Sequence, residues 1–189
     1  TGRVRPRARR RDHRHGSVNG RLLLLMKGPE AGFFRDILGR VDPTLALVHC
    51  PDAVRLEAES AADRRRTRLI AFSTQIIVPR AVLERLDYNA YNFHPGPPSY
   101  PGSKPSAFAV YEGAREFGVT LHRMAAKVDS GEIVAVDRFQ IDPGAAARDV
   151  AIEAYGRMAR LALNAAPALA QVSRPLRPCG ENWVGAKRR

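Results

Sequence analysis

The sequence predicts an α/β fold in which helices flank a mainly parallel sheet. Short apolar segments of strand length alternate with segments whose apolar residues recur at three- and four-residue spacing, which is typical of helices that connect parallel strands. The chain has 189 residues and is 44% hydrophobic, enough for one continuous core. Its longest apolar run near the start, residues 22–26, is far shorter than the roughly 20 residues that cross a bilayer. We therefore expect one domain and no membrane span.

The first half of the chain supplies four of the expected strands. The first strand reads RLLLLM, a turn through Gly28 and Pro29 follows it, and Pro43 ends the next helix. Pro79 stands at a helix start, where its missing N–H is harmless. The expected strands are 21–26, 44–50, 68–72 and 88–93, and the expected helices are 31–40, 52–66 and 81–86.

The second half begins with a loop and ends with a long helix. Gly and Pro crowd residues 95–105, a density that is incompatible with regular structure and predicts a defined loop. Pro167 is expected to kink the last helix or to end its regular part. The expected helices are 106–116 and 148–172, and the expected strands, 118–124 and 132–141, surround a turn at 129–131.

A glycine-rich dinucleotide loop is absent from the sequence. The first strand is followed by KGPEAGFF and not by the G-x-G-x-x-G pattern that lets the backbone approach a pyrophosphate. We therefore expect a Rossmann-like sheet that does not bind NAD.

The positive charge is concentrated at the two ends of the chain. Of the net charge of +12, +6 falls in residues 1–20 and +4 in residues 174–189, which leaves +2 for residues 21–173. Arginine-rich arms can bind nucleic acid through phosphate contacts, but no aromatic residues are interleaved here to stack on bases. We interpret 1–20 as a basic disordered tail, 21–172 as the catalytic domain and 173–189 as a basic C-terminal tail, and we do not expect nucleic acid as a partner.

The two cysteines, Cys50 and Cys179, fit neither a disulfide framework nor a metal motif. We interpret them as ordinary thiols of a reducing compartment. Because no signal peptide is recognisable either, a cytoplasmic location is expected.

Asn92 and His94 are the first candidates for a chemical site. They lie two residues apart at the end of an expected strand, so their side chains leave the same face. The carboxyl ends of strands are where open α/β sheets place their ligand crevice. Taken alone, a histidine at a strand end such as His94 is more often structural, and Asp129 alone would be a turn former.

Three linked motifs resemble the signature of the folate-dependent formyltransferase family. They are Asn92-Phe93-His94-Pro95, the segment GVTLHRM at 118–124, and Asp129-Ser130-Gly131-Glu132-Ile133, in that order. The family includes glycinamide ribonucleotide, methionyl-tRNA and amino-sugar formyltransferases and formyltetrahydrofolate deformylase. The resemblance covers roughly residues 21–170 and is strongest over 71–141.

The resemblance implies transfer of a formyl group from 10-formyltetrahydrofolate to an amine of a small-molecule acceptor. Asn92 would stabilise the oxyanion, His94 would bond the same centre or move the amine proton, and Asp129 would orient the imidazole. No metal is implied. The resemblance also implies that the donor's pterin is bound near four residues: Ser73, Gln75, Ile76 and Val128.

The departures from the family pattern concern the acceptor and the first half of the chain. The loop 96–102 lacks the arginine with which most members end it, and the stretch between Cys50 and Arg68 is short. Only about twenty residues follow the last helix, so the tRNA-binding domain of the methionyl-tRNA enzyme is not expected, and GVTLHRM favours an amino-sugar acceptor. A catalytically silent domain that binds folate or a partner is the alternative. Whether the protein forms a homodimer stays open. Whether Asn182 and Trp183 pack back on the domain stays open as well.

Overall fold

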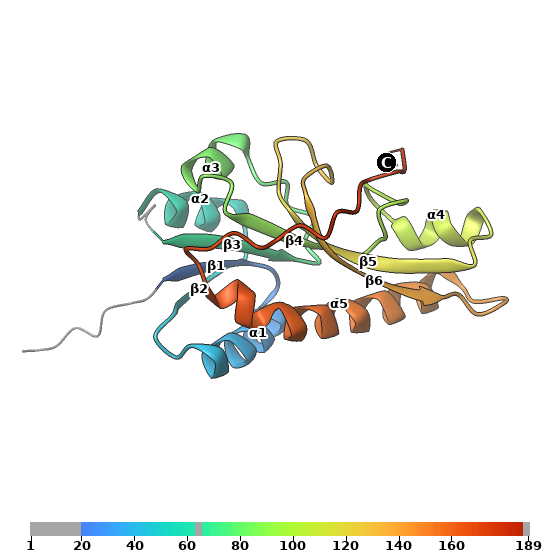
Figure 1. Cartoon of the computed structure of the whole chain (residues 1–189), viewed down its shortest axis with the longest axis horizontal. Helices are drawn as coiled ribbons and strands as arrows, with labels where there is room; N and C mark the ends of the chain where they lie inside the picture. The colour runs from blue at the N-terminus through green and yellow to red at the C-terminus, as the bar shows by residue number, and fades with distance from the viewer. Residues whose placement is uncertain (1–19, 63–65, 187–189) are drawn as a thin grey trace, which may run out of the picture.

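The computed structural model describes residues 20–62 and 66–186 and is built around a six-stranded sheet with the strand order β2-β1-β3-β4-β5-β6 (Figure 1). The first four strands in this order are parallel, whereas β5 runs antiparallel to both β4 and β6. The mainly parallel sheet is therefore confirmed, with an antiparallel edge. The strands are β1 (Arg21–Leu25), β2 (Ala46–Cys50), β3 (Thr67–Phe72), β4 (Ala90–His94), β5 (Glu116–Arg123) and β6 (Ile133–Gln140).

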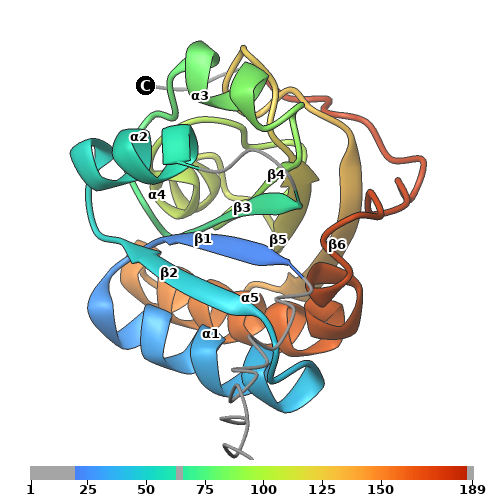
Figure 2. The same cartoon turned by 90° about the vertical axis from the view of Figure 1, so that its left-hand side faces the viewer.

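Helices cover both faces of this sheet. Helices α1 and α5 lie side by side on one face, and α2 and α3 lie on the other (Figure 2). Helix α4 follows the loop after β4 and packs against α5. The helices are α1 (Gly28–Val41), α2 (Ala53–Ala62), α3 (Arg80–Arg85), α4 (Pro105–Tyr111) and α5 (Ala147–Ala170). No helix in the described part of the chain combines the length and hydropathy that a membrane crossing requires.

The start of α1 and the end of α4 differ from the expected helices. Helix α1 begins at Gly28, so Gly28 and Pro29 form its first turn, where proline's missing N–H has no intrahelical partner to lose. Helix α4 ends at Tyr111, because Gly113 adopts a φ of 69° that no helix continues through. Helix α5 agrees with the expected helix 148–172, and it continues through Pro167 to Ala170, so Pro167 does not end it. Residues 1–19, 63–65 and 187–189 lie outside the described residues, and with them most of the expected N-terminal tail, part of the expected 52–66 helix and the last three residues of the expected C-terminal tail.

The sheet separates two hydrophobic cores, and β4 contributes to both. Tyr91 and Phe93 face the core beneath α1 and α5, whereas Ala90 faces the smaller core beneath α2 and α3. Since side chains alternate along a strand, Asn92 and His94 lie on the α2 and α3 side. The smaller core also contains Cys50, where burial raises the pKa of the thiol to about 11, so this thiol stays protonated at neutral pH.

Candidate active site

The last residue of β4, His94, is at the centre of the candidate site. Its side chain is 4% exposed, and its two ring nitrogens face different groups. Nε2 lies 3.0 Å from the carbonyl oxygen of Tyr100, and Nδ1 lies 3.7 Å from Oδ2 of Asp129. The Tyr100 carbonyl is a hydrogen-bond acceptor, so Nε2 carries a hydrogen, and the Asp129 carboxylate is close enough for its charge to stabilise a protonated imidazole. The surroundings of His94 can therefore hold a proton taken from a reacting group.

Asn92 is joined to a second histidine by the pairing of β4 with β5. Asn92 and His122 are direct cross-strand partners in this antiparallel pair, so their side chains leave the sheet on the same face. The amide nitrogen of Asn92 lies 3.2 Å from Nε2 of His122. The Nδ1 of His122 donates to the carbonyl of Arg123 at 2.9 Å, which leaves Nε2 to accept from the amide. One N–H of Asn92 remains to donate elsewhere.

Asp129 connects the two histidines. It follows β5 in a turn and adopts a φ of 50°, a left-handed conformation that Asp tolerates. Its Oδ2 faces Nδ1 of His94 and accepts from the backbone N–H of Gly102 at 2.8 Å, while its Oδ1 lies 3.5 Å from Nε2 of His122. The structure thus brings Asn92, His94 and Asp129 together around His122.

The loop after β4 fits against the imidazole because residue 96 is glycine. A Cβ at Gly96 would lie 2.8 Å from Nε2 of His94 and 2.7 Å from Cβ of Pro105, so any side chain there would displace the ring or the loop. The hydroxyl of Thr120 donates to the Gly96 carbonyl at 2.8 Å, which ties this loop to β5. The crowded glycines and prolines therefore form a defined rim, as the sequence predicts.

Burial decides the charge of His94, and its neighbours decide the charge of Asp129. Burial lowers the pKa of His94 and outweighs the Asp129 carboxylate and the Tyr100 carbonyl, which favour the protonated form. Burial would raise the pKa of Asp129, but His122, His94 and the backbone N–H of Gly102 together outweigh it and lower that pKa. At neutral pH the site therefore combines a neutral imidazole with an ionised carboxylate.

The four residues expected to bind the donor lie in two loops beside this group. Ser73 follows β3, and because Phe72 pairs with Phe93 it comes next to the end of β4 that carries His94. Gln75 is exposed and Ile76 packs at the edge of the smaller core. Val128 is half-buried and directly precedes Asp129. Residues 73–79 belong to no helix or strand, so their backbone N–H and C=O groups do not take part in the hydrogen bonds of a helix or a sheet.

Sequence reasoning missed two residues that the structure places in the site. His122 stands within the GVTLHRM motif, but only the β4–β5 register aligns it with Asn92. Trp183 packs its ring edge-on against both imidazoles, with centroid distances of 5.0 Å to His122 and 5.7 Å to His94. The open question about Trp183 is thus answered, since it packs back on the domain. Among the described residues, no group of three His, Cys, Asp or Glu side chains could hold a metal ion.

Comparison with known proteins identifies one family. The family model described as "Formyl transferase" matches residues 59–161, which is more than half of the chain. The methionyl-tRNA formyltransferase of Afipia carboxidovorans is 33% identical over 110 residues, covering 58% of this chain and 36% of that relative. The chain thus spans about a third of that relative's length.

Solved structures of formyltransferases share the fold. A formyltransferase from Anoxybacillus kamchatkensis, solved with UDP-4,6-dideoxy-4-formamido-L-AltNAc and tetrahydrofolate, superposes with a TM-score of 0.74 at 20% identity, covering 89% of this chain and 85% of that one. A 4-N formyltransferase from Francisella tularensis gives 0.73 at 13% identity, with coverages of 90% and 76%. Glycinamide ribonucleotide transformylase 1 from Symbiobacterium toebii gives 0.63 at 17%, with coverages of 80% and 88%. At these identities the likeness is one of fold.

Proposed function

The chain belongs to the formyl transferase family, and from this premise we propose that it transfers a formyl group from 10-formyltetrahydrofolate to an amine of a small-molecule acceptor. The observation that carries the proposal is the convergence of Asn92, His94 and Asp129 at the carboxyl end of β4. Formyl transfer needs a donor to the oxyanion, a base for the amine proton and a charge that stabilises the protonated base. This group supplies all three.

The reaction follows from these positions. The amine nitrogen forms a bond to the formyl carbon, and the carbonyl oxygen becomes an oxyanion that accepts the remaining N–H of Asn92. Neutral His94 takes the proton that the amine loses, and the ionised Asp129 3.7 Å away stabilises the imidazolium. The bond from the formyl carbon to N10 then breaks, and His94 returns the proton to the leaving nitrogen.

The formyl donor would lie against the two loops that flank the site. A pterin ring presents hydrogen-bond donors and acceptors on a flat apolar body, so it needs backbone polar groups and aliphatic side chains. The backbone of residues 73–79, which is outside the helices and strands, would supply the polar groups, and the side chains of Ile76 and Val128 would supply the aliphatic surface. Ser73 and Gln75 would add polar contacts. The complex of the Anoxybacillus relative with tetrahydrofolate supports a folate as the donor.

An amino sugar is the acceptor class that we favour. The fold relative that superposes with a TM-score of 0.74 was solved with a formamido sugar nucleotide. The loop after His94 packs against the imidazole at Gly96 and Tyr100, so the acceptor would have to reach His94 from another side of the ring. We also propose a cytoplasmic location, a homodimer and the division into 21–172 and two flanking basic segments.

Turnover with a panel of amines tests the function. The protein is incubated with 10-formyltetrahydrofolate and amino-sugar nucleotides, glycinamide ribonucleotide or water, and tetrahydrofolate release is followed by absorbance. His94→Ala and Asp129→Ala should abolish release, and Asn92→Ala should lower kcat roughly 10²–10³-fold. Glu84→Ala, on the exposed side of α3, is the matched control and should keep the wild-type rate. Release that survives in His94→Ala would refute the proposal.

A catalytically silent folate-binding domain is the second candidate. It is favoured by one observation, because His94 is 4% exposed and both of its nitrogens already face protein groups. In that case calorimetry would detect binding of the folate. No tetrahydrofolate would be released in the presence of any amine or of water alone.

A further inference from the structure

The segment 179–186, which we call the strap, crosses the candidate site after α5 has ended. At its start the backbone N–H of Cys179 donates to the Ile133 carbonyl of β6 at 2.9 Å. At its end the N–H groups of Val184 and Gly185 share the Pro98 carbonyl at 3.2 and 3.3 Å. In Figure 1 this red segment passes in front of the sheet and reaches the loop beside α4. The strap therefore bridges β6 and the loop that follows His94.

Trp183 covers both histidines from the strap. Its ring stands edge-on to His122 at 5.0 Å and to His94 at 5.7 Å, and its Nε1 donates to the Gly131 carbonyl at 2.8 Å. Under this ring the side chain of His122 is 3% exposed. An attacking amine must come within hydrogen-bond reach of His94. With Trp183 in this position the His94 side chain is 4% exposed, so the ring covers the side from which an amine would reach it.

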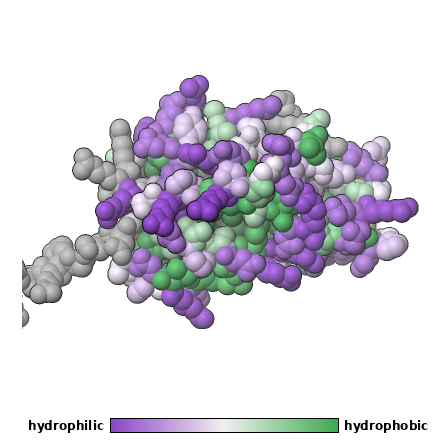
Figure 3. All heavy atoms as spheres, viewed as in Figure 1, coloured by the Kyte–Doolittle hydropathy of each residue, from purple (hydrophilic) through white to green (hydrophobic). Residues whose placement is uncertain are grey.

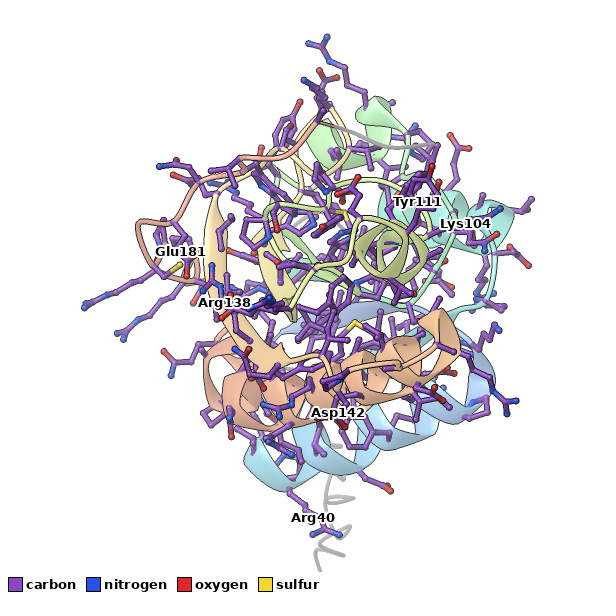
Figure 4. All side chains as sticks on the ribbon, turned by 90° about the vertical axis from the view of Figure 1, so that its right-hand side faces the viewer. Arg40, Lys104, Tyr111, Arg138, Asp142 and Glu181 are labelled. Carbon is purple, nitrogen blue, oxygen red and sulfur yellow. The ribbon has the colours of Figure 1, made fainter. Side chains whose placement is uncertain are left out.

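The strap is attached at the edge of the large core, by backbone hydrogen bonds at its two ends, by the Trp183 side chain and by one exposed ion pair. Leu176 is the last residue of the large core, and its N–H donates to the Tyr91 hydroxyl at 2.9 Å. Beyond it, the side-chain pair of Arg138 and Glu181 is 40% and 37% exposed, and pairs at such exposure contribute at most about 1 kcal/mol. Figure 4 shows these two side chains together at the rim of the molecule. Contacts at the edge of a core can break locally without global unfolding.

We propose that the strap is a reversible closure of the site, in which Trp183 occupies the space that the formyl group and the amine need at His94. The strap swings away when the formyl donor enters and closes again when the products leave. This inference rests on the proposed function, because that function is what brings both substrates to His94. Leu176 acts as the fixed point, and residues 179–186 carry the motion.

Gly185→Ala opens the strap without changing Trp183 or either histidine. A Cβ at this position would lie 1.9 Å from the Ser99 carbonyl oxygen, a backbone atom that cannot rotate aside. Gly32→Ala is the matched control, because a Cβ there has nothing within 4 Å. Trp183→Ala removes the covering ring itself. Val184→Ala, at a side chain that is 77% exposed, is the control within the strap.

Chemical modification of His94 measures the closure directly. Each variant is treated with diethyl pyrocarbonate at pH 7, and the modified His94 peptide is quantified over time by mass spectrometry. Gly185→Ala and Trp183→Ala should react at least about tenfold faster than the wild type, because a protected group reacts through the open state. Gly32→Ala and Val184→Ala should match the wild type. Equal rates in all five proteins would overturn the closure.

Fluorine NMR tests whether the donor opens the strap. Trp183 is the single tryptophan of the chain, so protein labelled with 5-fluorotryptophan gives one resonance. Addition of 5-formyltetrahydrofolate should move this resonance to the position that it has in Gly185→Ala. Binding detected by calorimetry with an unmoved resonance would overturn the opening step. Neither readout needs turnover, so a lack of activity towards every amine would refute the proposed function while the modification rates still decide the closure.

Discussion

At the scale of single residues, the candidate site is organised by what surrounds His94. Its two nitrogens face the Tyr100 carbonyl and the Asp129 carboxylate, while Nε2 of His122 lies 3.2 Å from the Asn92 amide nitrogen and 3.5 Å from Asp129 Oδ1. Burial keeps the ring neutral, and the two acceptors stabilise it once it has taken a proton. This is the balance that a general base requires.

The pH dependence of kcat should reflect the lowered pKa of His94. Since burial lowers this pKa from 6.5, the ring is neutral above that pH, and kcat should fall on the acid side only below pH 6.5. Asp129 raises the same pKa, so Asp129→Asn should move the acid limb to still lower pH while lowering kcat roughly 10²-fold. The pH profiles of the wild type and of Asp129→Asn are measured with the same acceptor. The ionisation of the acceptor then affects both profiles equally and cancels in the comparison. A limb that moves to higher pH in the variant would contradict this assignment.

His122 should act as a positioning residue for Asn92. His122→Phe keeps the ring volume but removes the acceptor 3.2 Å from the Asn92 amide, so kcat should fall about 10²-fold as the amide loses its orientation. KM for the acceptor should change little. His122→Gln retains an acceptor and should recover part of the rate. A rise in KM at constant kcat would instead indicate a role in substrate binding.

At the scale of elements, the end of α5 is fastened to the sheet by a buried arginine. Arg68 of β3 is fully buried, and its guanidinium donates to the carbonyls of Leu169 at 2.7 Å and Ala168 at 2.9 Å and to Asn89 Oδ1 at 3.0 Å. It thereby satisfies carbonyls that every helix end leaves unpaired. Pro167 has no N–H, so the carbonyl of Leu163 one turn earlier loses its helical hydrogen bond. The helix accommodates this loss because Leu163 lies on the exposed side of α5.

Removal of the Arg68 side chain should destabilise the whole domain. Arg68→Met keeps most of the aliphatic stem but leaves the carbonyls at the end of α5 buried without donors, which should cost about 2–4 kcal/mol of unfolding free energy. The exposed Arg177→Met should change it by less than about 0.5 kcal/mol. Urea denaturation of both variants measures the difference. Equal effects would mean that Arg68 does not fasten the helix.

At the scale of the whole molecule, two cores hold the site between them. The larger core lies under α1 and α5, and Figure 3 shows hydrophobic surface near the middle of this view, framed by hydrophilic side chains. A groove of about 500 Å³ is lined by residues that include Val134, Leu161 and Leu176. Leu121, which also lines it, faces the larger core, so the groove is on the other side of the sheet from His94.

Phe34 should be a main determinant of stability in the larger core. Its ring is fully buried and stands 5.4 Å from the Phe72 ring and 5.8 Å from the Phe93 ring, so it joins α1 to β3 and β4. Phe34→Ala should lower the unfolding free energy by about 3–5 kcal/mol, and Phe33→Ala, at its half-buried neighbour, by clearly less. Thermal unfolding measures both. A larger loss for Phe33 would contradict this packing.

The sequence by itself determined the order of strands and helices, because the spacing of apolar residues and the positions of proline and glycine act locally. It also determined that Asn92 and His94 share a face, since a strand alternates with a period of two. Which strands pair, and in which register, depends on contacts between residues far apart in the chain. Only the tertiary structure therefore decided that His122 stands opposite Asn92, that Asp129 reaches both histidines, and that Trp183 closes over them.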